Sequence, residues 1–429
     1  METHKKIPSL RTKRSNLQDK KTPYKEIASY LAMTILIPAF PGSVHSGEFS
    51  GYIGGQARVF FEDPLSPVQH NSYLSAVTEP EYTHQWDDGA QSFNAKLFYR
   101  VDQYDEQRTH GDIRELSWTG VYDNWELLAG ISKVFWGVAE TQHLVDIVNQ
   151  TDLVENLDGE DKLGQPMLKA STEREWGTID LFILPGFRER TFPGPEGRPR
   201  PNVVIDTEQD AVYDFSSGKD HIDLAARYYH YIDEWEFGLS FFSGTSREPT
   251  DFSPVGISQA GEPIVLPVYS LINQFGIDGQ AFFGDWTWKL EAINTEARSG
   301  VKKGINSIRS VAGFEYTLVG IADSDMDLGF VVEYHFSDKR IYENTIFDND
   351  LATALRFVFN DAQSTEILAG LTTDADTQSI GSFIEASRRL GESWTLEAQV
   401  RTFHGTKENR PLYSFRFDNY AQLDLNYHF

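Results

Sequence analysis

The chain has 429 residues, a formal net charge of −26 and no cysteine, so its composition excludes disulfide bridges and thiolate metal sites. Aromatic residues make up 13% of the sequence, yet the mean hydropathy is only −0.42, which indicates that apolar side chains are interspersed with polar ones. The acidic excess argues against nucleic acid as a partner. The length fits either several domains or one large β-structure.

The N-terminal segment differs from the rest of the chain. Lysine and arginine residues precede the apolar stretch LAMTILIPAF at 31–40, and small residues follow it up to Ser46. This order predicts a secretory signal peptide, residues 1–46, cleaved after Ser46. The alternative is a single membrane anchor, but the apolar core is too short to span a bilayer of about 30 Å.

From residue 94 onward, apolar and polar side chains alternate with a period of two. In NAKLFYRVD, Leu97, Tyr99 and Val101 fall on one side, and only Phe98 is out of step. The same alternation recurs at 235–242, 329–336 and 394–401. This period predicts strands with one apolar face.

The connections between these strands are of two kinds. Several short polar turns are followed at once by tryptophan, at Trp125, Trp176, Trp235, Trp286 and Trp394. The others are long and polar, at 186–219, 245–264, 299–304, 338–349 and 405–411. Alternating short and long connections, with an aromatic girdle at the short-turn end, predict an all-β fold, a transmembrane antiparallel up-and-down β-barrel with short periplasmic turns and long extracellular loops.

Assigning strands by this rule gives about 18 strands. The second strand and the 166–185 hairpin have the weakest patterns, so sixteen is the alternative count. The predicted strands are 49–61, 70–84, 91–103, 112–121, 125–136, 166–174, 177–185, 220–231, 234–244, 265–281, 286–297, 305–319, 326–337, 350–360, 362–373, 376–389, 392–404 and 412–429.

The chain ends on the alternating segment AQLDLNYHF, which places Leu423, Leu425, Tyr427 and Phe429 on one face. Such a strand resembles the C-terminal signature of Gram-negative outer-membrane β-barrels of porin-like type. The resemblance implies the outer membrane as the location, contact with its lipid and lipopolysaccharide, and recognition of the terminal strand by the barrel assembly machinery. It indicates an architecture and does not name a solute.

A barrel of this size has a wide interior, which is usually water-filled or plugged. Charged side chains on the polar face suit a hydrated lumen, because an Arg or Lys facing lipid at the midplane costs about 2–4 kcal/mol. The alternation predicts that eight charged side chains face the lumen: Lys96, Arg100, Glu236, Lys289, Glu291, Glu333, Glu397 and Arg401.

Segment 137–166 breaks the two-residue period. Leu144, Ile147, Val148 and Thr151 follow helical spacing. In place and character the segment resembles the inward-folded constriction loop of general porins, and the alternative is an ordinary exposed loop. Its acidic residues, predicted to line a pore constriction, are Asp146, Asp152, Glu155, Asp158, Glu160 and Asp161.

The outer loop 186–219 carries Arg188, Arg190, Arg198 and Arg200 among prolines that stiffen it. If both loops enter the lumen, acidic and basic groups face each other across the channel, and their transverse field orients polar solutes. The alternative is that the arginines pair with nearby acids or with lipopolysaccharide phosphates.

No metal or cofactor is expected. The segment ENLDGEDK lacks the ligand spacing of a calcium loop, and no nucleophile elbow, zinc-binding, phosphate-binding or dinucleotide-binding motif occurs. His143, His335 and His428 stay open as members of a triad formed only by geometry, although structural or lumen roles are more common.

These patterns favour an outer-membrane channel for passive passage of small hydrophilic solutes or ions, with no enzymatic activity. The acidity of the chain predicts a preference for cations, and the alternative is that the arginine cluster of loop 186–219 reverses this preference locally. One alternative is a plugged barrel that acts as an enzyme or as a structural partner of an envelope complex. A third, weaker alternative is a secreted soluble β-protein.

Overall fold

The computed structural model describes residues 47–343, 345–408 and 410–429. The predicted signal peptide, residues 1–46, lies outside the described residues. Within those residues, no helix combines the length and the apolar character needed to cross a membrane.

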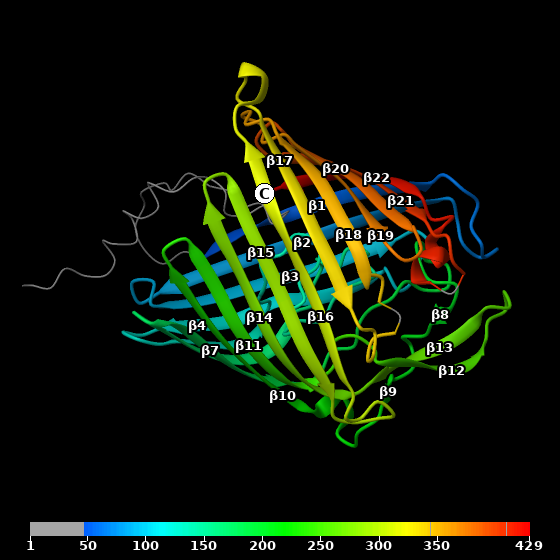
Figure 1. Ribbon diagram of the computed structural model, residues 1–429, viewed down its shortest axis with the longest axis horizontal. Coiled ribbons are helices and arrows are strands. Elements are labelled where there is room, and N and C mark those ends of the chain that lie inside the picture. The colour runs from blue at the N-terminus through cyan, green and yellow to red at the C-terminus, as the bar shows by residue number, and fades with distance from the viewer. Residues whose placement is uncertain (1–46, 344, 409) are drawn as a thin grey trace, which may run out of the picture. The chain divides into compact units, whose positions relative to one another are not determined.

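Eighteen strands form one antiparallel sheet that closes on itself (Figure 1). Each barrel strand pairs with the next along the chain, and the last, β22, pairs with the first, β1. The barrel strands are β1 (Glu48–Phe60), β2 (Ser72–Trp86), β3 (Gln91–Asp102), β4 (His110–Val121), β5 (Glu126–Ser132), β6 (Gln165–Arg174), β7 (Gly177–Pro185), β10 (Ile222–Ile232), β11 (Trp235–Thr245), β14 (Leu271–Phe283), β15 (Trp286–Ala297), β16 (Asn306–Leu318), β17 (Asp327–Ser337), β18 (Asn349–Val358), β19 (Glu366–Asp374), β20 (Ile380–Leu390), β21 (Trp394–His404) and β22 (Tyr420–His428).

The closed barrel and its predicted count of eighteen strands are confirmed, and three strand boundaries are corrected. The strand predicted at 125–136 ends at Ser132, and the strand predicted at 412–429 begins only at Tyr420, after a short 3-10 helix, η3 (Pro411–Phe415). The strand predicted at 265–281 is two strands, because the chain leaves the barrel before Leu271.

A small second sheet lies outside the barrel sheet. It joins β12 (Asp251–Ile257) and β13 (Pro263–Tyr269) as an antiparallel hairpin, and β13 pairs in parallel with β8 (Val204–Ile205) and β9 (Val212–Tyr213). Figure 1 shows the hairpin extending from one end of the barrel strands. Two further 3-10 helices, η1 (Gly218–Asp220) and η2 (Ile321–Asp323), lie in connections.

The barrel strands expose their apolar faces outward. On β3, Leu97, Tyr99 and Val101 are 46–51% exposed, whereas Phe98 and Arg100 between them are 6% exposed. Phe98 departs from the apolar alternation because it packs inside the barrel, 4.4 Å from the Arg114 guanidinium. A bulge in the β3–β4 pairing brings Arg114 to this position, since Lys96 pairs with Glu115 but Leu97 pairs with Ile113.

The short-turn end carries outward aromatic side chains. Trp125, Trp176, Trp235, Trp286 and Trp394 are each 39–56% exposed. Several lie against a neighbouring aromatic ring, as Trp394 does with Tyr427 at 5.1 Å between centroids. Indole and phenol groups in such a ring suit a membrane–water interface, where one end is apolar and the other is hydrated.

The C-terminus completes the closure of the barrel. The Phe429 amide donates to the Gly51 carbonyl at 3.0 Å, and the Gly51 amide donates to the Phe429 carbonyl at 3.1 Å. The Leu423, Leu425 and Tyr427 side chains are exposed on the outer face, as is Phe429. Recognition of this strand by an assembly machinery stays a prediction.

Because the outer face is apolar, we predict that Leu239→Arg destabilises the barrel in a phospholipid bilayer by about 2–4 kcal/mol. The matched control is Ser387→Arg, whose side chain would point inward beside Glu397. Both variants are unfolded with urea in lipid vesicles, and the loss of the heat-modifiable gel band with urea concentration gives the free energy of unfolding of each. Equal stability of the two variants would show that hydrocarbon is not the outer solvent.

Candidate functional site: the loop inside the barrel

The connection between β5 and β6, residues 133–164, lies inside the barrel, and we call it the lumen loop. Its apolar side chains pack on inward-facing residues of β6 through β16, which we call the apolar wall. The cluster comprises Trp136, Ala139, Leu144, Val145, Ile147 and Val148 of the loop with Met167, Phe182, Leu184, Ala225, Phe242, Ile272, Ile293 and Val311 of the wall.

The helical spacing within this segment does not produce a helix. Leu144, Ile147, Val148 and Thr151 are buried, but the chain runs through turns and bends instead of a helix. Burial against the wall, and not helical packing, accounts for the apolar positions. Phe242 is an apolar residue on the otherwise polar inner face of β11. This exception in the sequence was a signal that an apolar segment packs against β11 inside the barrel.

Two inward-facing carboxylates, Glu291 of β15 and Glu333 of β17, hold the main chain of the lumen loop. Glu291 accepts from the backbone amides of Val138 at 2.7 Å and Ala139 at 2.9 Å, and also from Val145 at 3.1 Å. Glu333 accepts from the Glu140 amide at 2.7 Å. Both carboxylates were predicted to face the lumen, and both point inward, but the loop covers them so that they are at most 1% exposed.

Two cations of the barrel strands bind the loop side chain Glu140, which the sequence analysis missed. Glu140 pairs with Lys289 of β15 and with Arg356 of β18, at 2.9 Å from the latter. Both cations also pair with Glu315 of β16. Burial opposes ionisation of Glu140, but Lys289 and Arg356 outweigh it and hold its pKa below the usual value.

The other end of the lumen loop binds the opposite side of the barrel. Glu155 pairs with Arg100 of β3 at 2.8 Å and with His110 of β4 at 2.9 Å. Asp152 pairs with Arg114 of β4 at 2.7 Å. Burial opposes ionisation of Glu155, but Arg100 and His110 outweigh it, and its pKa lies well below the usual value. The loop therefore crosses the interior and is held at both sides.

The remaining acidic residues of the loop differ in their surroundings. Asp158 pairs with Arg401 of β21 at 2.9 Å, and Glu160 lies 3.1 Å from His143. Asp146 is enclosed, and its carboxylate lies 3.4 Å from the Lys162 ammonium. The Asp161 side chain is exposed. A pore-lining role for these residues stays a prediction.

The four arginines of the 186–219 loop fall into two groups. Arg188 and Arg190 contact the lumen loop, since Arg188 donates to the Gly164 carbonyl and Arg190 donates to Gln150 at 3.3 Å. Arg198 and Arg200 are buried among the outer loops instead. Arg198 pairs with Asp418 at 2.6 Å, and Arg200 pairs with Glu262 at 2.7 Å.

The inward side chains of β20, β21, β22 and β1 through β4 form a different surface, which we call the acidic wall. Lys96 pairs there with Glu81 at 2.8 Å, and Arg401 pairs with Glu385 at 2.9 Å. Carboxylates predominate, and they keep part of their surface exposed. They are Glu79, Glu81, Glu115, Glu385, Glu397 and Asp424.

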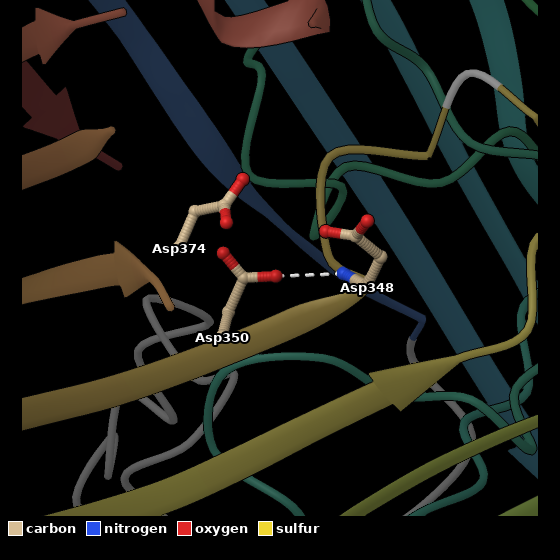
Figure 2. Close-up of side chains that lie close together, drawn as sticks. All are labelled: Asp348, Asp350 and Asp374. Atoms are coloured by element: carbon tan, nitrogen blue, oxygen red, sulfur yellow. Dashed lines mark hydrogen bonds between the residues drawn. The ribbon is translucent and has the colours of Figure 1, made fainter. Parts of the chain in front are cut away.

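Three aspartates form a further cluster near the long-loop end. Asp348 precedes β18, Asp350 lies within it, and Asp374 ends β19, with the Asp350 carboxylate accepting from the Asp348 amide at 2.6 Å (Figure 2). Arg410 donates to Asp348 at 2.6 Å and to Asp374 at 2.8 Å, and Lys339 pairs with Asp348. Two side-chain cations thus already offset two of its three carboxylates.

The three histidines left open for a triad have no serine partner among the described residues. His335 lies 2.7 Å from the Thr141 hydroxyl, and His428 lies 2.8 Å from the Thr395 hydroxyl. His143 lies beside Glu160. These contacts tie the histidines to the loop and the strands around them.

No protein-family model and no curated protein matches the chain. Among solved structures it is similar to a triple mutant of the Rhodopseudomonas blastica porin, at 12% identity and a TM-score of 0.40, and to a second variant of that porin, at 11% and 0.43. A third, from work on the asymmetric conductivity of engineered proteins, gives 11% and 0.42. Each alignment covers 90% of this chain and 100% of the other. The assignment of the fold rests on the strand pairing.

We predict that Glu140→Gln and Glu155→Gln release the lumen loop. Glu155→Gln leaves the buried Arg100 without its carboxylate partner, which costs about 3–5 kcal/mol. Glu140→Gln costs less, because Glu315 still pairs with Lys289 and Arg356. Protease cleavage within residues 138–160 of the folded barrel should rise in both variants. Glu160→Gln is the matched control, because Glu160 is half-exposed and contacts a residue of the same loop. Unchanged protection in all three would mean that other contacts hold the loop.

We also predict that the loop stays bound when the pH falls from 7 to 4.5. A carboxylate whose pKa is lowered in the folded state stabilises that state above its unfolded pKa of about 4.3, and this contribution is lost as pH falls through the lowered value. Hydrogen exchange of the loop amides, corrected for intrinsic rate, should therefore be constant over this range. Faster exchange of the loop amides already at pH 5 would contradict the prediction that Glu140 and Glu155 stay ionised with a lowered pKa.

Proposed function

We propose that the chain is an outer-membrane channel of porin type through which small hydrophilic solutes or ions pass passively. A closed barrel satisfies every strand edge, which is the requirement for crossing hydrocarbon with β-structure. The apolar outer face and the aromatic ring at the short-turn end support a membrane location. The long loops then face the outside of the cell, where lipopolysaccharide is their expected neighbour.

The observation that carries the proposal is the asymmetry of the interior. The lumen loop packs on the apolar wall and also buries Glu291 and Glu333. Across the interior, Glu397, Asp424 and Glu79 of the acidic wall keep part of their surface exposed. The loop thereby narrows the interior on one side and leaves a polar, hydrated surface on the other, where a solute can pass.

The charge of this surface favours cations. Carboxylates outnumber the cationic groups of the acidic wall, and Lys96 and Arg401 are themselves engaged by Glu81 and Glu385. Asp158 of the lumen loop adds to the acidic side beside Arg401. In the 186–219 loop, Arg188 and Arg190 lie close enough to the lumen loop to form the basic side of a constriction.

We predict cation-selective conductance in planar bilayers, measured as a reversal potential in a salt gradient. Glu397→Gln combined with Asp424→Asn should shift that potential toward zero, because a carboxylate attracts a monovalent cation 4 Å away by about 1 kcal/mol in water. The control is Asp123→Asn, in an exposed short turn. An unchanged potential in the double variant would exclude the acidic wall as the route.

A second candidate function is a plugged barrel that serves as an enzyme or as a structural partner in the cell envelope. The dense anchoring of the lumen loop favours it, since apolar packing and buried ion pairs act together on one segment. The same bilayer experiment separates the two. A folded, heat-modifiable barrel without conductance above background would support the plugged barrel and contradict the channel.

A further inference from the structure

A cavity of about 440 Å³ lies between the lumen loop and the wall formed by β6, β7, β10, β11 and β14. Its size falls in the range of small-molecule sites, roughly 300–1,000 Å³. Tyr231 and Glu236 line it and flank the short β10–β11 turn, so the cavity lies toward the short-turn end. It is separate from the acidic wall, and we call it the niche.

A row of three charged side chains crosses the wall of the niche. Asp180 of β7 and Arg227 of β10 are opposite each other in the strand pairing. Arg227 Nη2 extends over β11 and donates to Asp278 Oδ2 of β14 at 2.7 Å. Gly238 of β11 permits this crossing, because a Cβ there would lie 2.5 Å from Asp278 Oδ1 and 2.7 Å from Arg227 Nη2.

Each residue of this row retains an atom without a hydrogen bond. Arg227 Nη1, Asp278 Oδ1 and Asp180 Oδ1 are buried and have no hydrogen-bond partner within the described part of the chain. The three residues are only 6–9% exposed. Because an unsatisfied buried polar group costs about 1–3 kcal/mol, such atoms call for a partner from the adjoining space. The row offers a donor between two acceptors.

Aromatic groups adjoin the charged row. The Arg227 guanidinium lies 5.3 Å from the centroid of the Trp136 ring. Tyr229 and Tyr231 line the niche next to it, with ring centroids 6.2 Å apart, and the Tyr231 side chain is 55% exposed. Aromatic faces bury the C–H surface of a ligand while polar groups fix its orientation.

We propose that the niche is a binding subsite for a neutral, hydroxyl-rich solute, a sugar or polyol. A hydroxyl group donates and accepts at once, so adjacent hydroxyls match the acceptor–donor–acceptor row of Asp180, Arg227 and Asp278. Lys169, 3.8 Å from Asp180, and Arg227 offset two of the three carboxylates that line the niche, and the third, Glu236, accepts from the Gln280 amide at 2.6 Å. Each carboxylate thus has a partner within the protein, so a ligand needs no charge of its own to bind there. The further step, that such molecules are the solutes of the channel, rests on the proposed function.

Calorimetric titration of the folded barrel in detergent micelles with sucrose tests the subsite. Saturable binding is expected, and Asp278→Asn and Tyr229→Ala should each weaken it at least tenfold. Tyr122→Ala, at an exposed short turn, is the matched control and should bind like the unchanged protein. Asp278→Asn disturbs a buried ion pair. If the Asp278→Asn variant does not fold, the binding affinity of the Tyr229→Ala variant decides the test.

Three outcomes would overturn the inference: no saturable sucrose binding, equal binding by the Tyr229→Ala variant, or tighter binding of glycine betaine, a zwitterion without hydroxyl groups. Sucrose-dependent reduction of current in planar bilayers completes the test. Conductance without sucrose binding would reject the niche and leave the channel intact. Binding without conductance would reject the channel and leave the niche as the site of a plugged barrel.

Discussion

A peptide group without a hydrogen-bond partner costs several kcal/mol in hydrocarbon, and the closure of β22 on β1 removes the last unpaired strand edge of the barrel. Once this constraint is met, every strand separates two environments. The outer face carries Leu97, Tyr99 and their equivalents, and the inner face is free to carry charge. In the proposed channel, the outer face contacts lipid and the inner face contacts solute as a consequence of that separation alone.

Inside the barrel, charged side chains do more than line a hydrated surface: they fix the course of the lumen loop. Glu140 and Glu155, at opposite ends of the lumen loop, bind cations on opposite sides of the barrel. Apolar packing then covers only one of the two walls. An interior that is packed on one side and polar on the other follows from where these few ion pairs attach the loop.

The sequence predicted the barrel well because strand alternation and turn length are local signals. Tryptophans after short turns, from Trp125 to Trp394, marked one end of the barrel, and the strand count was right. The β12–β13 hairpin was not foreseen, because its pattern near residue 265 continues into β14 without a break. Glu140 was missed for a different reason: only the register of β15, β16 and β18 brings Lys289, Glu315 and Arg356 together. Inward-facing charges were predictable residue by residue, whereas their partners depend on the closed sheet.

Glu291 and Glu333 grip the lumen loop by its amide groups, and the side chains at 138 and 139 take no part in those hydrogen bonds. Ala139 is buried in the apolar cluster, but Val138 lines the niche, and there a hydrogen bond to the main chain is indifferent to residue type, with proline as the exception. In the proposed channel, the side chain at this position can therefore change by substitution while the course of the loop stays fixed. If the channel is as proposed, its selectivity can evolve at such positions without a change of fold.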